Sequence, residues 1–319
     1  NRSLKDSPYD RLPLASKNLV RKEIWDLSKN SAGISIKFIT NSSSITVKWL
    51  LLNDFIMHHM PNSGIKGIDL YCRSSRRWQY VGTGIPEGKS NEKTIIKNLS
   101  IKKREFKLYL PLYDGIEKLE IGIQNQSSID KPPKSTKKPI VFYGTSITQG
   151  GCASRPGLAH TNIISRETDI DCINFGFSGN GRMEKTISSI LTEIDALFYV
   201  IECLANMTRT QVAKNTMPLV KIIRKKNPLT PIVFIENIIF ESGYFNKKIK
   251  NEIEKKNNEL KIQFNKMINE NIKNIFYISQ EGAIGEDHEG TVDGVHFNDL
   301  GFMRYSDFLI NNFKKMKIL

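Results

Sequence analysis

The sequence has no uninterrupted apolar stretch near the roughly 20 residues that a membrane-spanning helix requires. It has only four cysteines, with no C-x-x-C pair among them: Cys72, Cys152, Cys172 and Cys203. Apolar surroundings favour buried thiols at Cys172 and Cys203, but four cysteines allow three disulfide pairings and the sequence leaves the choice open. The five histidines and these cysteines show no spacing typical of a zinc site. The sequence therefore predicts neither a metal nor an organic cofactor.

Positive charge dominates the sequence, which has a formal net charge of +14. The basic residues are scattered as short pairs, such as those at 102–103 and 314–315, and no basic run is interleaved with aromatic residues. This distribution indicates a solvated lysine-rich surface rather than a specific nucleic-acid site. The excess charge would still attract an acidic polymer or surface over long range.

The first half of the chain alternates apolar and polar residues, as antiparallel strands with one buried face do. Rows of this kind run through residues 34–38, 45–51, 106–112 and 119–123. Turn-rich stretches such as 40–44 and 82–90 separate them, and no clear helical stripe interrupts residues 34–125. This half predicts an antiparallel, jelly-roll-like β-sandwich.

The second half alternates short apolar runs with amphipathic segments of helix length. The runs are residues 140–143, 172–175, 196–201, 232–235 and 275–278, and the helical segments include 208–226, 247–271 and 299–315. Short buried strands separated by helices are typical of a parallel sheet covered on both faces. A polar, proline-containing stretch at 127–139 separates the halves. We therefore predict a β-sandwich domain at 1–130, a linker at 131–138 and a three-layer α/β/α domain at 139–319.

Five residues suited to acyl transfer each follow a predicted strand: Ser146, Gly179, Asn206, Asp293 and His296. In an open parallel sheet the carboxyl ends of the strands share one edge, where ligand sites gather. A hydroxyl, an imidazole and a carboxylate that meet there can pass a proton. A glycine N–H and an asparagine amide can polarise a carbonyl oxygen. Together these residues favour a serine esterase.

Each residue also has a purely structural interpretation. Ser146 and Gln149 fit a helix capping box, although the two glycines that follow would break a helix beginning there. Asn206 suits the cap of the helix predicted at 208, and Gly179 suits a simple turn. The glycine loop after the first strand is neither a P-loop nor a dinucleotide fingerprint, and Thr148 excludes the G-x-S-x-G elbow.

The pair Asp293 and His296 has a spacing of three, which lets one turn bring carboxylate and imidazole together. A solvated loop with an ordinary histidine is the alternative. The adjacent residues Asp287 and His288 are a weaker candidate for the same role.

Four blocks in this order resemble the SGNH, or GDSL-type, esterases and acylhydrolases: GTSITQG at 144–150, FSGNG at 177–181, CLANM at 203–207 and DGVHFNDLG at 293–301. The resemblance implies that Ser146 is the nucleophile, His296 the base and Asp293 its orienting partner. It also implies that Gly179 and Asn206 are oxyanion donors.

The resemblance extends to the first half of the chain. The sequence GIDLY at 67–71 is similar to the G-x-D-L-Y motif of a subgroup in which a β-sandwich precedes the catalytic domain. Two positions depart from the family pattern. Thr145 stands where the family name has aspartate, and Asn206 lacks the G-x-N-D context that many members have.

We expect hydrolysis of a small ester, with an acetyl group on a carbohydrate as the preferred substrate class. Trp25, Trp49 and Trp78 can offer sugar-stacking faces, although core packing is the alternative for each. A lipid or thioester acylhydrolase and a non-catalytic glycan-binding protein are the rival interpretations.

His59 is a further candidate near the substrate, if the loop at 57–61 reaches the catalytic edge. The expected partner is a small ester or an acylated carbohydrate, with no specific nucleic acid, and the oligomeric state is not determined by the sequence. The resemblance implies a secreted or periplasmic bacterial enzyme.

Overall fold

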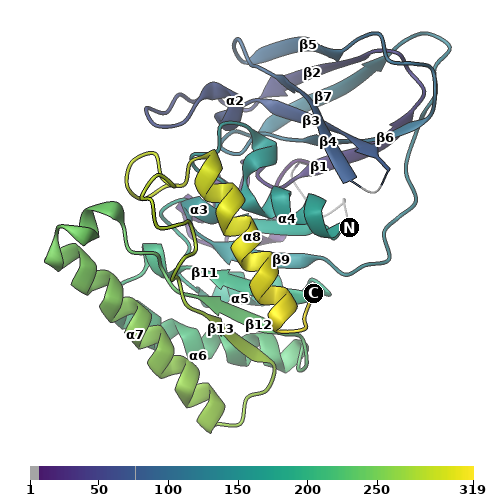
Figure 1. The fold of residues 1–319 in the computed structure, drawn as a ribbon. Coiled ribbons are helices and arrows are strands. Elements are labelled where there is room, and N and C mark those ends of the chain that lie inside the picture. The colour runs from purple at the N-terminus through teal and green to yellow at the C-terminus, as the bar shows by residue number, and fades with distance from the viewer. Residues whose placement is uncertain (1–6, 76) are drawn as a thin grey trace.

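The structure, a computed structural model, describes residues 7–75 and 77–319 and shows a β-rich half followed by an α/β half (Figure 1). Residues 1–6 and 76, which belong to the predicted N-terminal domain, lie outside the described residues. The first half contains a five-stranded sheet in the order β4-β3-β6-β1-β8 and a three-stranded sheet in the order β5-β2-β7. The strand pairs in both sheets are antiparallel.

The bounds of these strands are β1 Ser35–Thr40, β2 Ile45–Leu51, β3 Ile68–Ser74, β4 Arg77–Gly84, β5 Ser90–Ile96, β6 Arg104–Tyr109, β7 Ile116–Ile123 and β8 Ile129–Asp130. The alternating apolar residues of the two sheets face each other and form a separate core. Trp49 of β2 is buried at its centre, and its indole N–H donates to the Lys66 carbonyl.

The second half is built on a parallel sheet in the order β10-β9-β11-β12-β13. The strands are β9 Ile140–Gly144, β10 Cys172–Gly176, β11 Phe198–Glu202, β12 Ile232–Ile235 and β13 Ile275–Ile278. Strand β9 lies between β10 and β11, and all five of its residues are buried. Its two neighbours pair with it in register, so that Gly144 lies beside Gly176 on one side and Glu202 on the other.

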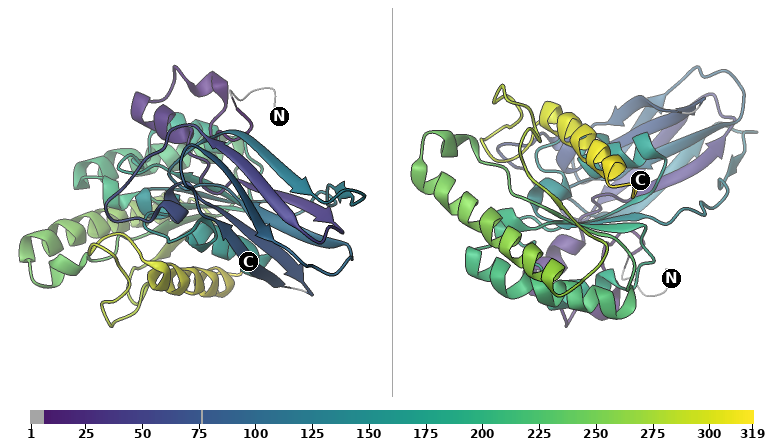
Figure 2. Two further views of the ribbon diagram at one scale, coloured as in Figure 1. Left: turned by 90° about the horizontal axis from the view of Figure 1, so that it is seen from above. Right: turned by 60° about the horizontal axis from the view of Figure 1, so that its bottom comes forward.

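Helices cover both faces of this sheet, as the right-hand view of Figure 2 shows. One core packs α4 (His160–Thr168) and α8 (Asp299–Lys315) on the first face, and a second core packs α5 (Lys185–Leu191), α6 (Arg209–Lys226) and α7 (Lys247–Asn269) on the other. Shorter elements connect them: α3 Ser146–Gln149, η3 Pro156–Leu158, η4 Leu204–Asn206 and η5 Glu241–Tyr244.

The N-terminal segment precedes the β-rich half in sequence but packs against the α/β half. It contains η2 (Leu14–Ser16) and α1 (Lys22–Ser28), which the sequence pattern did not reveal. Leu12, Ile24 and Trp25 are buried in the same core as α5, α6 and α7. The segment 12–25 therefore stabilises the α/β half, although it precedes the β-sandwich in sequence.

The predicted fold class is confirmed: antiparallel sheets come first, and a parallel five-stranded sheet with helices follows. The first half also contains a four-residue helix, α2 (Asn62–Ile65), which is too short to give a helical stripe in the sequence. The division at 1–130, 131–138 and 139–319 stays a prediction, and residues 131–139 carry neither helix nor strand. None of the helices in the described part of the chain has the length and apolar character that spanning a bilayer demands.

Candidate active site

Ser146 lies in a one-turn helix immediately after β9. Thr145 is the N-cap of α3 and forms a capping box with Thr148, whose Oγ1 accepts a hydrogen bond from the Thr145 N–H at 3.2 Å. The capping box that the sequence suggested, between Ser146 and Gln149, is therefore displaced by one residue. Gly150 ends the turn in a left-handed conformation (φ 111°) that favours glycine. Since Thr145 fills the cap, the Ser146 hydroxyl is left for other contacts.

The hydroxyl of Ser146 meets the imidazole of His296. Ser146 Oγ lies 2.9 Å from His296 Nε2, and His296 Nδ1 lies 2.8 Å from Asp293 Oδ2. Ser146 is nearly buried at 7% exposure, whereas the side chains of His296 and Asp293 are 23% and 35% exposed. The three groups thus form a continuous hydrogen-bonded chain at an open edge of the sheet.

The loop between β13 and α8 holds Asp293 in a fixed orientation. Asp293 Oδ1 accepts the backbone N–H of Val295 at 3.0 Å and that of His296 at 2.8 Å. Burial alone would raise the pKa of Asp293, but these hydrogen bonds and the one from the His296 ring lower it below its ordinary value. Asp293 is therefore ionised at neutral pH and can hold the ring through Nδ1.

Gly179 and Asn206 follow the two strands that flank β9. Gly179 has a φ of 70°, and a Cβ there would meet nothing within 4 Å, so its backbone borders open space. Asn206 Oδ1 accepts the Gly181 N–H at 3.2 Å, which leaves its NH₂ group as the free end of the amide. Among the hydrogen bonds between described residues, none uses the backbone N–H of Gly179 or Ser146 or the side-chain NH₂ of Asn206 as donor. These N–H groups are therefore available to bind an acceptor atom.

The alternative role for Asn206 as a helix cap was wrong. Thr208 caps α6, since its side chain accepts the Gln211 N–H and the Gln211 side chain returns a bond to Thr208. Asn206 instead belongs to η4 and connects to the loop after β10 through Gly181.

His59 lies at this edge, although it comes from the β-rich half. Its ring centroid is 5.4 Å from that of His296, and the planes are tilted by 54°. The weaker pair Asp287 and His288 is not joined, because Asp287 pairs with Arg304 and His288 with Glu241.

The cysteines and tryptophans are also placed. All four cysteines are free thiols, and Cys152, Cys172 and Cys203 are buried. Trp49 and Trp25 are 1% and 8% exposed, which removes both as open sugar-stacking faces. Trp78 carries Arg73 over its ring, with the guanidinium carbon 5.2 Å from the centroid.

Behind the Ser146 turn lies a buried polar cluster that the sequence did not reveal. Glu202, the last residue of β11, accepts hydrogen bonds from Thr148 Oγ1 at 2.8 Å and Tyr305 OH at 2.7 Å, and His160 Nε2 lies 3.2 Å away. Burial would raise the pKa of Glu202, but the charge and hydrogen bond of His160 and the two hydroxyl donors lower it. Thr148 thereby links this carboxylate to the cap of the Ser146 turn.

The β-sandwich supports the loop that follows Ser146. Asp69 of the GIDLY stretch is fully buried and accepts hydrogen bonds from Arg155 Nη1 at 2.9 Å and from the Gly157 N–H at 2.7 Å. Tyr71 OH is 2.6 Å from the same guanidinium. Gly64 leaves no room for a side chain, because a Cβ there would lie 2.1 Å from the Ala153 carbonyl oxygen.

The N-terminal segment supports the loop after β10 in a similar way. Arg21 Nη1 donates to Asn180 Oδ1 at 2.8 Å, and its Nε donates to Glu184 at 2.6 Å. Both partners flank the loop that carries Gly179. Segments from all parts of the chain therefore fix the position of the site.

Comparison with family models gives two matches that together cover most of the chain. The model of the GDSL-like lipase/acylhydrolase family matches residues 137–314. A second model, described as the N-terminus of SGNH-hydrolase-type esterases and named for the GxDLY motif, matches residues 1–129. No curated protein matches the chain at a significant level.

Several solved structures are similar over nearly the full length. A GDSL-like lipase from Bacteroides ovatus has 37% identity and a TM-score of 0.94, with 98% of this chain and 92% of that chain covered. A salicylyl-acyltransferase from a tetracycline biosynthetic pathway has 15% identity and a TM-score of 0.82, with 99% and 93% covered. An acetyl xylan esterase from Butyrivibrio proteoclasticus has 9% identity and a TM-score of 0.58, with 91% and 92% covered.

Proposed function

The chain belongs to the GDSL-like lipase/acylhydrolase family, and from that premise we propose that it is a serine ester hydrolase that removes short acyl groups, chiefly acetyl, from carbohydrate. The observation that carries the proposal is the hydrogen-bonded chain from Ser146 Oγ through the His296 ring to Asp293. A hydroxyl with an imidazole at 2.9 Å, itself held by an ionised carboxylate, is the arrangement that nucleophilic acyl transfer needs.

In the proposed reaction, Ser146 Oγ attacks the ester carbonyl while His296 Nε2 takes the hydroxyl proton. The negative charge that develops on the carbonyl oxygen is stabilised by the N–H groups of Gly179 and Ser146 and by the Asn206 amide. The tetrahedral intermediate then collapses, and His296 gives its proton to the departing alkoxide, which leaves as the sugar alcohol. The acyl group remains on Ser146 as an acyl-enzyme. Water, activated by His296, attacks the acyl-enzyme, releases the carboxylic acid and restores the serine.

The preference for a small acyl group on a large alcohol rests on exposure and charge. The outer members of the triad are 23% and 35% exposed, so an ester borne on a polymer can reach Ser146 from the solvent side. The net charge of +14 would in addition favour an acidic acylated polymer through long-range attraction, an effect that added salt would weaken. For an enzyme that acts on such a polymer, we propose a secreted or periplasmic location. Fractionation of cells that produce the protein tests this.

The decisive experiment measures acetate release from acetylated oligosaccharides by the full chain and by Ser146→Ala. The expected result is steady release by the native protein and loss of at least about a thousandfold in Ser146→Ala. Ser189→Ala, at an exposed serine of α5, is the matched control and should retain full activity. A Ser146→Ala protein that keeps more than a tenth of the activity refutes the assignment of the nucleophile.

Two rival functions are resolved by the same set of proteins. A lipid or thioester acylhydrolase would cleave long-chain esters or thioesters with higher kcat/KM than acetyl esters, again through Ser146. A non-catalytic glycan-binding protein would bind oligosaccharide while a fluorophosphonate probe fails to label Ser146.

A further inference from the structure

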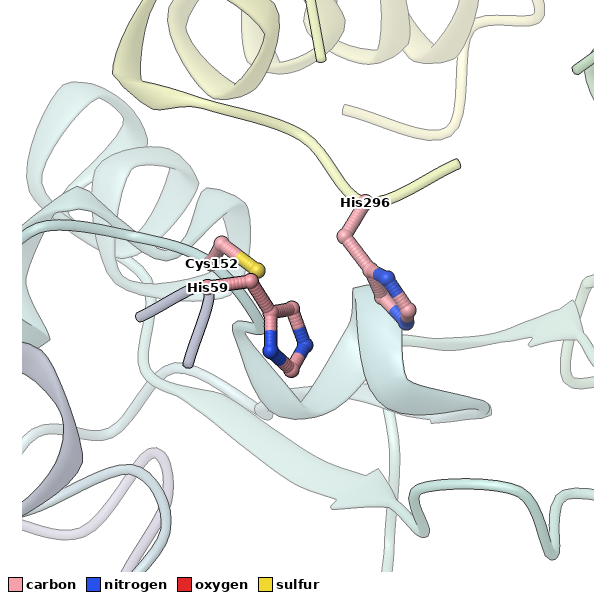
Figure 3. A group of neighbouring side chains, drawn as sticks. All are labelled: His59, Cys152 and His296. Carbon is pink, nitrogen blue, oxygen red and sulfur yellow. The ribbon is translucent and has the colours of Figure 1, made fainter. Parts of the chain in front are cut away.

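Three side chains that can bind a metal converge beside Ser146. The ligand atoms of His59, Cys152 and His296 all lie within 4.8 Å of one another. Figure 3 shows that they come from three separate segments: His59 and Cys152 lie side by side, and the His296 ring faces them from the loop before α8. Positions 59, 152 and 296 are so far apart that no sequence spacing could have indicated the cluster.

The ligand set matches one metal in particular. Two imidazoles and a thiolate are typical ligands of tetrahedral Zn²⁺, with Zn–N near ~2.0–2.1 Å and Zn–S near ~2.3 Å. Ligand atoms of such a site are about 3.5 Å apart, whereas the three atoms here lie within 4.8 Å of one another, so an ion would draw them together by at most roughly 1.3 Å. The fourth position would be filled by water or by the Ser146 hydroxyl.

The surroundings of His296 have the form of a metal-binding histidine. Its Nδ1 is held by Asp293 Oδ2 at 2.8 Å, which directs Nε2 toward Ser146. A carboxylate on the far nitrogen is the outer-shell partner that zinc-binding histidines commonly have, and it fixes the ring and increases its basicity. The negative charge of Asp293 also favours a cation at this place.

Cys152 has no evident role in the proposed ester hydrolysis. Its side chain is buried, with 3% exposure, beside the His59 and His296 rings. A zinc ion bound there would be held by the thiolate of Cys152, with release of the thiol proton.

We propose that His59, Cys152 and His296 form a Zn²⁺ site that switches the enzyme off. The ion would occupy the lone pair of His296 Nε2, which the proposed function requires for accepting the Ser146 proton. Bound zinc and catalysis are therefore mutually exclusive, and removal of the ion restores activity. The metal site itself does not depend on the proposed function; only its inhibitory effect does.

Binding is tested on the full-length Ser146→Ala protein, in which catalysis plays no part. Addition of Co²⁺ to the metal-free protein should give one tetrahedral ion per chain with thiolate-to-cobalt charge-transfer absorption, and Zn²⁺ should displace it. Cys152→Ala in the same background should abolish that absorption and weaken zinc binding at least about 10–100-fold. Cys72→Ala, at a half-buried cysteine of β3, is the matched control and should bind as before. Equal zinc affinity in the Cys152→Ala and control proteins would overturn the site.

Inhibition is tested on the chain with Ser146 intact, using ester hydrolysis by EDTA-treated protein. Micromolar zinc should inhibit the native protein, EDTA should reverse the effect, and Cys152→Ala should need at least tenfold more zinc. If zinc binds as proposed but the metal-free protein hydrolyses no ester, the proposed function fails and the site stands. If activity instead requires zinc, the inhibitory proposal is refuted.

Discussion

Replacing Asp293 by asparagine should slow ester hydrolysis by about four orders of magnitude, and the structure gives the reason. Asp293 Oδ1 accepts two backbone N–H groups, from Val295 and His296, while Oδ2 faces His296 Nδ1. In asparagine the single oxygen must keep the two backbone donors, because an NH₂ group cannot accept them. The NH₂ group then faces Nδ1, which must act as acceptor and cannot carry the proton.

The consequence is the wrong tautomer of His296, the base in the proposed reaction. The proton moves to His296 Nε2, where it points at Ser146 Oγ, so the ring can no longer accept the hydroxyl proton. A tautomer change of this kind in a serine hydrolase costs about 10⁴ in kcat, which corresponds to roughly 5.4 kcal/mol in the activation free energy at about 1.36 kcal/mol per tenfold. Binding of the substrate is not affected, so KM should change little.

The assay is steady-state hydrolysis of a chromogenic acetate ester, with kcat and KM determined separately. Asp287→Asn is the matched control: it lies in the same loop but pairs with Arg304, and its activity should stay within about twofold of native. A loss of less than about tenfold in Asp293→Asn would show that the carboxylate does not set the tautomer, and the reasoning from the two backbone donors would fail.

Three further predictions concern the groups around the triad. Asn206→Ala should lower kcat by about 10²–10³ with little change in KM; a loss below threefold removes Asn206 from the oxyanion site. Glu202→Gln should reduce the free energy of unfolding by roughly 1–3 kcal/mol at neutral pH in urea titrations. The pKa of Glu202 is lowered in the folded state, so the stabilisation that its carboxylate gives is complete above the unfolded-state pKa near 4.5 and is lost as pH falls through the folded-state pKa. The difference in unfolding free energy between native and variant should therefore shrink below about pH 4; a difference independent of pH contradicts this. Asp69→Ala should destabilise the protein by about 3 kcal/mol, since it leaves the Arg155 charge without its buried partner; an unchanged denaturation midpoint excludes that role.

The strands of the α/β half could be predicted because each is a short, fully apolar run between helices. The pattern at 140–143 became β9, and the amphipathic segment at 299–315 became α8. The N-terminal helix α1 was not predicted because its core-facing apolar residues, Ile24, Trp25 and Leu27, span about one helical turn, which is too short to establish a period.

The candidate residues could be proposed because the carboxyl ends of parallel strands share one edge of the sheet. That rule placed Ser146 and His296 at the same edge, and the structure joins them at 2.9 Å. It could not indicate Glu202, since a single acidic residue at the end of an apolar strand looks like an ordinary surface position. Its partners, His160 and Tyr305, lie on α4 and α8, and these helices reach Glu202 only when they pack against the sheet.

The sequence suggested that His59 could reach the site, but it did not reveal that Leu112 and Tyr113 of the same half contact the Ser146 turn, and these contacts bear on how the chain is divided. Tyr113 OH donates to the Ser146 carbonyl at 3.3 Å, and Gln149 Nε2 donates to the Leu112 carbonyl at 3.0 Å, so the sandwich contacts both ends of the α3 turn. The His59 ring, from the same half, lies 5.4 Å from that of His296. A turn of only four residues has little stability of its own, and the geometry at Ser146 therefore depends on packing against this half. Tyr113→Phe, which removes the hydroxyl bonded to the Ser146 carbonyl, should accordingly alter kcat even though this side chain does not contact the substrate in the proposed reaction.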